Sequence, residues 1–345
     1  MLKRSVIVGL AAILVLLVGC EKEEQADADT NADLMEKEMV EEAEKVETAA
    51  DEYWSQAIDS ELCQTIRECR DLGDEYGSEF FYDFIGGLNA SNRMSNINAY
   101  TEEDKSVLAT NTWVEEVPIV ARYELREDEF FLTEGEEESM FTGIADLVLD
   151  IFNRNRINVK MVDFQEDIYM HVNTYEDKLY IPSNLVKQWL QSYTLPILVH
   201  EYGHLVSWNE ADFVISDTCP AEQFYYKPYG GECYNPDSYM NHFFQSYWKN
   251  YEEQWLQGGY VSVEDRIAFY EEQKESFITI YASVNPYEDI AESFKFFMLT
   301  PYNNDPQTVA DEKVNFFYQF PELVEYRTFV IKTLKDRKDE MLSFW

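Results

Sequence analysis

Positive charge is scarce in this sequence. Its 345 residues include 27 lysines and arginines against 67 aspartates and glutamates, which gives a formal net charge of −40 at pH 7. A surface with this balance repels the phosphates of nucleic acids and the headgroups of an anionic membrane. We therefore expect no nucleic-acid partner. The acidity can favour basic substrates or keep the protein soluble, and we favour the second interpretation.

Long hydrophobic runs and potential metal ligands are also few. The longest apolar run, residues 6–18, is shorter than the roughly 20 residues that a membrane-spanning helix needs. None of the five cysteines forms a C-x-x-C pair, so a structural zinc site made of thiolates is not expected. The chain has only four histidines. A histidine metal site must therefore use a small set of residues.

The amino terminus is organised like that of an exported lipoprotein. Lys3 and Arg4 precede the apolar run, which ends in Leu17-Val18-Gly19-Cys20. This ending resembles the bacterial lipobox, in which cleavage occurs immediately before a cysteine that becomes lipidated. The resemblance implies a signal peptide over residues 1–19 and a mature chain held by lipid on Cys20 at the extracytoplasmic face of a bacterial cell membrane. An uncleaved short membrane anchor is the alternative.

Acidic residues dominate the next segment. Residues 21–52 hold 14 acidic and 3 basic positions and few large apolar ones. Such a composition does not form a hydrophobic core, so we expect residues 20–52 to be an extended or transiently helical tether. Residues 53–140 contain no recognisable motif. We interpret them as an N-terminal subdomain of unknown role.

The four cysteines that follow Cys20 can form disulfides in an exported chain. They allow three pairings, and we predict the local ones, Cys63 with Cys69 and Cys219 with Cys233. Residues six apart on a continuous helix are too distant for a disulfide. The first pair therefore requires that no helix continues from Cys63 to Cys69.

Two of the four histidines lie four residues apart in the segment Leu198-Val199-His200-Glu201-Tyr202-Gly203-His204-Leu205-Val206. On a helix this spacing places both imidazoles on one face, where they can bind one Zn²⁺, and Glu201 can reach the water that the metal activates. The apolar residues around them give the helix a buried side. The alternative is a pair of surface histidines on an amphipathic helix. The motif favours a zinc metallopeptidase.

A catalytic zinc site usually has a third protein ligand. The metzincin pattern would place it six residues after His204, following a glycine, but Glu210 and Ser207 occupy those two places. The residues after Asn285 offer another source. Asn285 is a typical helix cap and Pro286 a typical first helical residue, so an amphipathic helix is predicted there.

Three acidic residues of this second helix are candidate ligands, namely Glu288, Asp289 and Glu292. Glu288 also has a purely structural interpretation, because a glutamate at the third helical position can belong to a capping box with Asn285. The spacing alone does not choose among the three.

The two motifs together resemble those of the gluzincins of the anthrax lethal factor type, which include the secreted Pro-Pro endopeptidases. That family has H-E-[FY]-G-H on one helix and Y-x-x-x-N-x-x-E-x-x-A-E-x-F on a second. The second pattern is matched at Tyr281, Asn285, Glu288, Ala291, Glu292 and Phe294. The connection between the helices, about residues 209–276, is much longer than in the family.

The resemblance implies a role for each matched residue. Zinc would be bound by His200, His204 and Glu288. Glu201 would be the general base, Tyr281 would stabilise the oxyanion, and Glu292 would orient a ligand histidine. The implied activity is hydrolysis of peptide bonds in a peptide or protein substrate in the cell envelope or outside the cell, with one Zn²⁺ per chain. A scaffold protein has no chemical need for the base and the tyrosine, so the enzyme is favoured over a non-catalytic binding or envelope scaffold.

The implied fold is α+β, with a zincin-like metallopeptidase domain over residues 141–345 that is mainly helical and contains a small mixed sheet. Residue periodicity predicts helices over Phe141–Asn155, Tyr239–Trp255, Val263–Ala282 and Pro321–Lys338, and strands over Ile157–Phe164, Ile168–Thr174 and Lys178–Ile181. We interpret the other two histidines, His171 and His242, as ordinary strand and helix residues.

Overall fold

The computed structural model describes residues 48–84, 117–136, 138–152, 159–166, 170–186, 194–226, 231–251 and 263–338. The chain divides into two units, Met1–Gln56 and Ala57–Trp345. In the first unit, residues 48–54 are helical. The predicted signal peptide, Cys20 and most of the predicted tether lie outside the described residues. In the described part of the chain, no helix is long and apolar enough to span a membrane.

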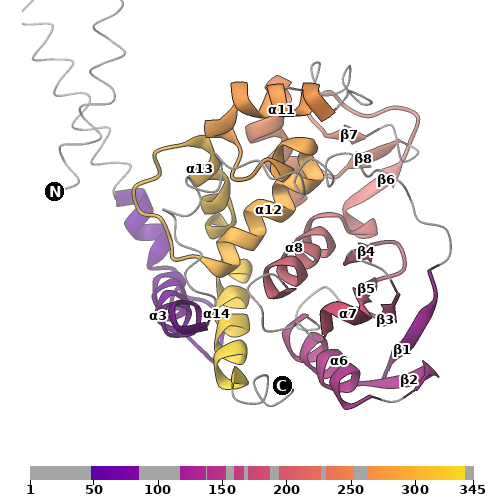
Figure 1. Ribbon diagram of the computed structural model, residues 1–345. Helices are drawn as coiled ribbons and strands as arrows, with labels where there is room; N and C mark the ends of the chain where they lie inside the picture. Colours follow the sequence, from indigo (N-terminus) through magenta and orange to yellow (C-terminus); the bar gives the residue numbers. More distant parts are fainter. Residues whose placement is uncertain are drawn as a thin grey trace, which may run out of the picture. The chain divides into compact units, whose positions relative to one another are not determined.

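The second unit is α+β and contains a mixed five-stranded sheet with the order β2-β1-β3-β5-β4 (Figure 1). Its strands are β1 (Ile119–Arg126), β2 (Glu129–Gly135), β3 (Met161–Gln165), β4 (His171–Asn173) and β5 (Lys178–Pro182). Only β3 and β5 pair in parallel, with Val162 opposite Leu179. Strand β4 is antiparallel to β5, with His171 opposite Tyr180, and forms one edge of the sheet.

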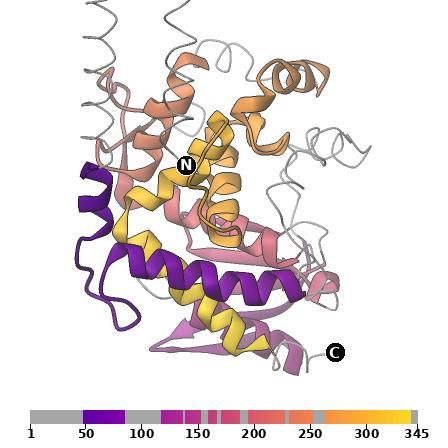
Figure 2. The same ribbon diagram turned by 90° about the vertical axis from the view of Figure 1, so that its left-hand side faces the viewer.

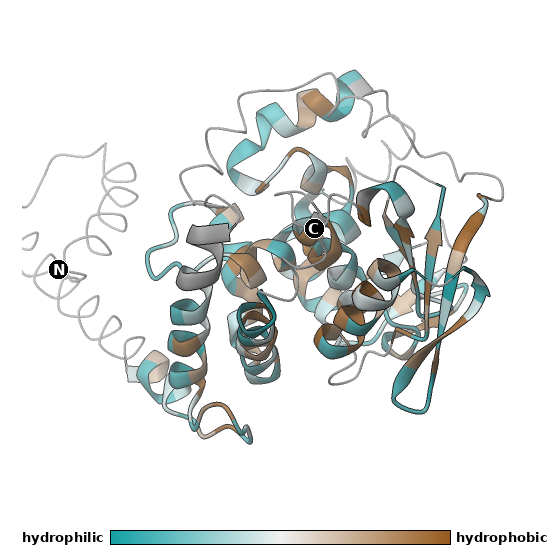
Figure 3. Cartoon of the chain, turned by 60° about the horizontal axis from the view of Figure 1, so that its bottom comes forward, coloured by the Kyte–Doolittle hydropathy of each residue, from teal (hydrophilic) through white to brown (hydrophobic). Residues whose placement is uncertain are grey.

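Alternation along the strands creates a hydrophobic face that packs on α6 (Ser139–Phe152). On β3, Val162 and Phe164 are fully buried, and on β5 Leu179 and Ile181 are buried on the same face. The Phe141 ring of α6 stacks on Phe164 with 4.5 Å between ring centroids. Figure 3 shows that helices packed in this unit carry both hydrophobic and hydrophilic stretches, as expected for helices with one buried face.

Helix α3 (Ile66–Phe84) lies against the C-terminal helix α14 (Pro321–Asp336), as Figures 1 and 2 both show. The Thr328 hydroxyl of α14 donates a hydrogen bond to the Cys69 carbonyl oxygen at 2.6 Å. Helix α3 and strands β1 and β2 come from the segment interpreted as an N-terminal subdomain. In the structure they belong to the same compact unit as the rest of residues 57–345.

Both predicted disulfides are present. Cys63 pairs with Cys69 at a Cα–Cα distance of 5.1 Å, and Cys219 pairs with Cys233 at 5.5 Å. Because α3 begins at Ile66, Cys63 precedes the helix and the required interruption exists.

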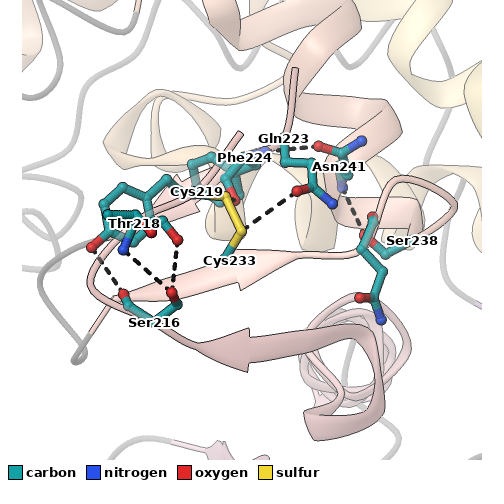
Figure 4. Close-up of a disulfide and its surroundings, with 10 residues drawn as sticks. Ser216, Thr218, Cys219, Gln223, Phe224, Cys233, Ser238 and Asn241 are labelled. Atoms are coloured by element: carbon teal, nitrogen blue, oxygen red, sulfur yellow. Dashed lines mark hydrogen bonds between the residues drawn. A yellow bond between two sulfur atoms is a disulfide. The ribbon is translucent and has the colours of Figure 1, made fainter. Parts of the chain in front are cut away.

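The long connection between the two motif helices forms a second, three-stranded sheet with the order β6-β8-β7. Its strands are β6 (Phe213–Ile215), β7 (Tyr225–Tyr226) and β8 (Glu232–Tyr234). The Cys219–Cys233 disulfide closes this segment, and the Asn241 side chain accepts a hydrogen bond from the Phe224 backbone N–H at 2.8 Å (Figure 4). The second sheet is therefore fixed to α9 (Tyr239–Phe243) of the same insertion, as well as closed covalently.

Two predicted helices of the insertion are shorter than expected. The first is α-helical only over α9 and continues as π-helix η3 (Phe244–Trp248) and 3-10 helix η4 (Lys249–Tyr251). The second, α11 (Val263–Glu272), ends ten residues before Ala282 and is followed by 3-10 helices η5 (Lys274–Ser276) and η6 (Tyr281–Val284). Tyr281 therefore lies in a separate short turn and not at the end of a long helix.

Candidate metal centre

Helix α8 (Thr194–Ser207) carries the first motif and lies between α12 (Pro286–Leu299) and strand β4 (Figure 1). One side of α8 is apolar, and Leu198, Val199 and Tyr202 are buried. The Tyr202 hydroxyl donates to the Phe152 carbonyl oxygen at 3.0 Å and ties α8 to α6. The histidines on the other side are also buried, with His200 at 5% and His204 at 8% exposure. They are therefore not surface residues.

Helix α12 carries the second motif and begins as the sequence predicts. The Asn285 side chain accepts hydrogen bonds from the backbone N–H groups of Tyr287 at 2.8 Å and Glu288 at 2.9 Å. Pro286 occupies the first helical turn, where its missing N–H costs nothing. The cap fixes the start of α12 and hence the position from which the Glu288 side chain leaves the helix.

Gly203 allows the two helices to approach closely. A Cβ atom at this position would lie 2.9 Å from the Ala291 Cα and 3.2 Å from the Phe294 Cβ. Those contacts are shorter than normal packing permits, so a larger residue would force α8 and α12 apart. Gly203, Ala291 and Phe294 belong to the two motifs, and the structure shows that they meet.

Three side chains converge where the helices meet. His200 Nε2 lies 3.1 Å from His204 Nε2, and the Glu288 Oε2 atom lies 3.2 Å from the first and 3.3 Å from the second. Among the described residues, this trio is the group of histidines, cysteines and carboxylates placed to hold a metal ion. The Glu288 carboxylate is directed to the imidazoles, and the cap of α12 is provided by the Asn285 side chain.

The near-equilateral arrangement suits a bound cation. Ligands about 2.05 Å from a tetrahedral centre lie about 3.3 Å from each other, which matches all three separations. Each imidazole Nε2 carries at most one hydrogen, so the two nitrogens can supply at most two hydrogen bonds. Three short contacts join the three atoms, so hydrogen bonds alone do not account for all of them. Two nitrogens and one carboxylate oxygen form a ligand set that divalent transition metals favour.

His200 is held at its other nitrogen by Glu292. His200 Nδ1 lies 2.8 Å from Glu292 Oε1, which favours a proton on Nδ1, so a neutral His200 ring would direct its Nε2 lone pair to the trio. Glu292 also pairs with Lys295 and accepts a hydrogen bond from the Thr279 hydroxyl at 2.7 Å. Burial opposes ionisation of Glu292, but Lys295 and His200 outweigh it and lower the pKa of Glu292.

The metal-free site favours a proton on His200. Burial opposes protonation of this imidazole, yet the adjacent carboxylates of Glu288 and Glu292 raise the pKa of His200 to about 10. The same pairing lowers the pKa of Glu288, because His204 and His200 stabilise its charge against the cost of burial. A proton therefore occupies part of the space that a cation would take.

Glu201 lies next to the trio, and its pKa is shifted in the opposite direction from that of Glu288. Burial raises the pKa of Glu201 to about 7, partly offset by the neighbouring histidines and by a hydrogen bond from the Val172 backbone N–H. Val172 belongs to edge strand β4. The carboxyl group is therefore held by the sheet and can gain or lose a proton near neutral pH.

Tyr281 lies beside His200, with 5.6 Å between the two ring centroids. Its hydroxyl hydrogen-bonds the Glu288 carboxylate, and burial together with that charge holds the pKa of Tyr281 well above its usual range. The Tyr281 hydroxyl is therefore protonated at neutral pH and can donate a hydrogen bond.

Two other candidate ligands, Asp289 and Glu210, lie outside the trio. Asp289 is fully buried and pairs with Lys313 at 2.6 Å, and it accepts from Trp248 Nε1 at 2.7 Å. Glu210 is exposed in 3-10 helix η2 (Glu210–Asp212). Neither belongs to the trio. His171 stacks on Tyr180, and His242 lies on α9 near Phe320, as expected for ordinary strand and helix residues.

Sequence reasoning missed three contributors to the site, namely Lys295, Thr279 and the Val172 N–H group. Lys295 had a local signal, because it lies three residues after Glu292 on the same helix. Thr279 and Val172 had none, since their contacts depend on how separate segments pack.

We compared the chain with protein-family models, with curated proteins and with solved structures, and none of the three comparisons found a match.

Proposed function

We propose that this protein is a zinc-dependent metallopeptidase. The observation that carries the proposal is the trio of His200, His204 and Glu288, whose ligand atoms lie 3.1 to 3.3 Å apart, with Glu201 buried beside it. Two histidines, one glutamate and an open fourth position are typical of catalytic zinc sites in metallopeptidases. The proposal also assigns the chain to the gluzincins that its motifs resemble.

A zinc ion bound by these residues would polarise a substrate carbonyl and lower the pKa of a water molecule toward about 7. Glu201 would accept a proton from that water and deliver it to the leaving amine. In the metal-free site burial raises the pKa of Glu201 to about 7, so this group can hold or release a proton near neutral pH.

The Tyr281 hydroxyl would stabilise the oxygen that becomes negatively charged in the transition state. Because its pKa is well above the usual range, it keeps its proton and donates a hydrogen bond. Strand β4 is an edge strand beside α8, so its outer backbone edge offers an extended peptide a place to add as a further strand. These features support a peptide substrate.

The direct test is Glu201→Gln, which preserves shape and removes the base. We expect the variant to bind zinc like the wild type and to lose cleavage of surface proteins, identified by comparing cleaved amino termini in cells that carry either form. Tyr281→Phe should retain zinc and lose about 10²-fold or more in kcat. Equal cleavage by Glu201→Gln and wild type would overturn the proposed mechanism.

The proposed location is the extracytoplasmic face of a bacterial membrane, through lipid on Cys20. Mass spectrometry of the mature amino terminus should find Cys20 lipidated, and Cys20→Ser should lack the lipid. An unmodified Cys20 at the mature amino terminus would contradict this location.

A further inference from the structure

The insertion contains a buried carboxylate that the chemistry above does not use. Glu232, the first residue of β8, is fully buried. Its Oε1 atom accepts hydrogen bonds from the Tyr175 hydroxyl at 2.6 Å and from Trp208 Nε1 at 3.2 Å. Its Oε2 atom accepts from the hydroxyls of Tyr287 at 2.8 Å and Tyr234 at 3.3 Å. Burying a carboxylate is costly unless its acceptor sites are filled, and four neutral donors fill them here.

Two of these donors belong to the helices that carry the metal trio. Tyr287 immediately precedes Glu288 in the first turn of α12. Trp208 immediately follows α8, and its backbone N–H donates to the His204 carbonyl oxygen at 2.8 Å. The rings of Trp208 and Tyr287 also contact each other, with centroids 4.6 Å apart. A single carboxylate thus connects the end of α8 to the start of α12.

Glu232 is held by the insertion itself. Strand β8 lies between β6 and β7, and the residue after Glu232 is Cys233, which is bonded to Cys219 (Figure 4). The carboxylate therefore projects from a paired and covalently closed element, which limits its movement.

We propose that Glu232 is a positioning residue of the metal centre. It fixes the first turn of α12 to the end of α8 through Tyr287 and Trp208, and so sets the position of Glu288 relative to His200 and His204. This role explains what the long insertion adds to the site. The inference rests on the metal site proposed above, and it is independent of the peptidase activity.

Tyr287→Phe tests the role, because it removes only the hydroxyl that joins Glu232 to α12. Tyr175→Phe is the matched control, since it removes one hydroxyl bond to the same carboxylate from the turn between β4 and β5. Zinc Kd is measured on the full-length protein by chelator competition, and the melting temperature of each metal-free variant is recorded. We expect Tyr287→Phe to weaken zinc binding about tenfold and Tyr175→Phe to leave it unchanged.

A lower melting temperature with an unchanged zinc Kd in Tyr287→Phe would show a merely structural bond and overturn the positioning role. Equal weakening in both variants would also overturn it, because the effect would not pass through α12. A wild-type protein that binds no zinc would overturn the proposed metal site together with this inference. The outcomes therefore separate failure of the positioning role from failure of the site.

Discussion

His200 is contacted by a carboxylate at each ring nitrogen, by Glu292 at Nδ1 and by Glu288 at Nε2. The two contacts have different consequences. The first fixes the tautomer and increases the basicity of the ring, while the second places a negative ligand atom where the lone pair of Nε2 is directed. Lys295 balances part of the negative charge through Glu292. One negative charge in this group of residues therefore remains to be balanced, either by a bound cation or by a proton on a histidine.

Glu288→Gln tests the ligand role at the scale of one residue. The Asn285 cap remains, but the variant loses the buried carboxylate that faces His200 and His204, so the metal-free stability should also fall. The loss of a charged ligand should weaken zinc binding by at least about 100-fold, because even the loss of an outer partner costs about 10–100-fold. Zinc titration and thermal unfolding of the same samples provide the measurement. Full zinc occupancy in the variant would assign the third ligand elsewhere.

The stabilisation of the folded protein by bound zinc should increase with pH. The folded metal-free His200 keeps its proton up to about pH 10, whereas the unfolded residue loses it near pH 6.5. This stabilisation of the metal-free form is therefore complete below about pH 6.5 and declines as the pH rises toward 10. Zinc binds the neutral imidazole, so one proton must leave, and affinity should rise about tenfold per pH unit.

The measurement is the increase in melting temperature caused by a fixed free zinc concentration at pH 6, 7 and 8. The added stabilisation should grow by about 1.4 kcal/mol per pH unit. A zinc-induced shift that is the same at all three pH values would contradict proton displacement from His200.

At the scale of elements, the site depends on the close approach of α8 and α12 at Gly203. Gly203→Ala would place a methyl group against the Ala291 backbone and should cost about 1–3 kcal/mol of unfolding free energy. The separation of the helices should also weaken zinc binding. Denaturant unfolding and zinc titration would measure the two effects.

Gly73→Ala is the matched control. A Cβ at Gly73 would lie 2.6 Å from Arg327 Nη1, where α3 packs on α14 and outside the metal trio. This variant should lose stability without losing zinc affinity. Equal loss of zinc affinity in both variants would show that general destabilisation, and not helix separation, controls the metal site.

Local rules predicted the elements that carry the site. The Asn285 cap, Pro286 and the apolar face of α8 act within one or two turns, so the sequence alone indicates where α12 begins and that α8 has a buried apolar side. The two disulfides were also predicted from local pairing. The five-stranded sheet confirms the expected α+β class with a mixed sheet.

Contacts between distant segments could not be predicted in this way. Glu232 reaches Tyr175, Trp208 and Tyr287 only after four separate segments fold together. The breaks after Phe243 and Glu272 also escaped periodicity, because the residues that follow keep apolar spacing while the backbone changes to π or 3-10 geometry. Such changes are decided by packing against neighbours.

At the scale of the whole molecule, the chain combines a strongly acidic sequence with a buried group of side chains that could hold a cation. The chain's net charge of −40 creates a negative field that attracts divalent metals and repels nucleic acids. That field does not select zinc. We propose that zinc is selected by the two imidazoles and the single carboxylate, whose ligand atoms lie 3.1 to 3.3 Å apart.

The most direct test of the central claim is the zinc content of the purified full-length protein, measured by elemental analysis after equilibrium with a slight excess of zinc. The account predicts about one Zn²⁺ per chain in the wild type, and less than a tenth of that in His204→Ala, because one of only three protein ligands is removed. One zinc per chain retained in His204→Ala, or none bound by the wild type, would contradict the account.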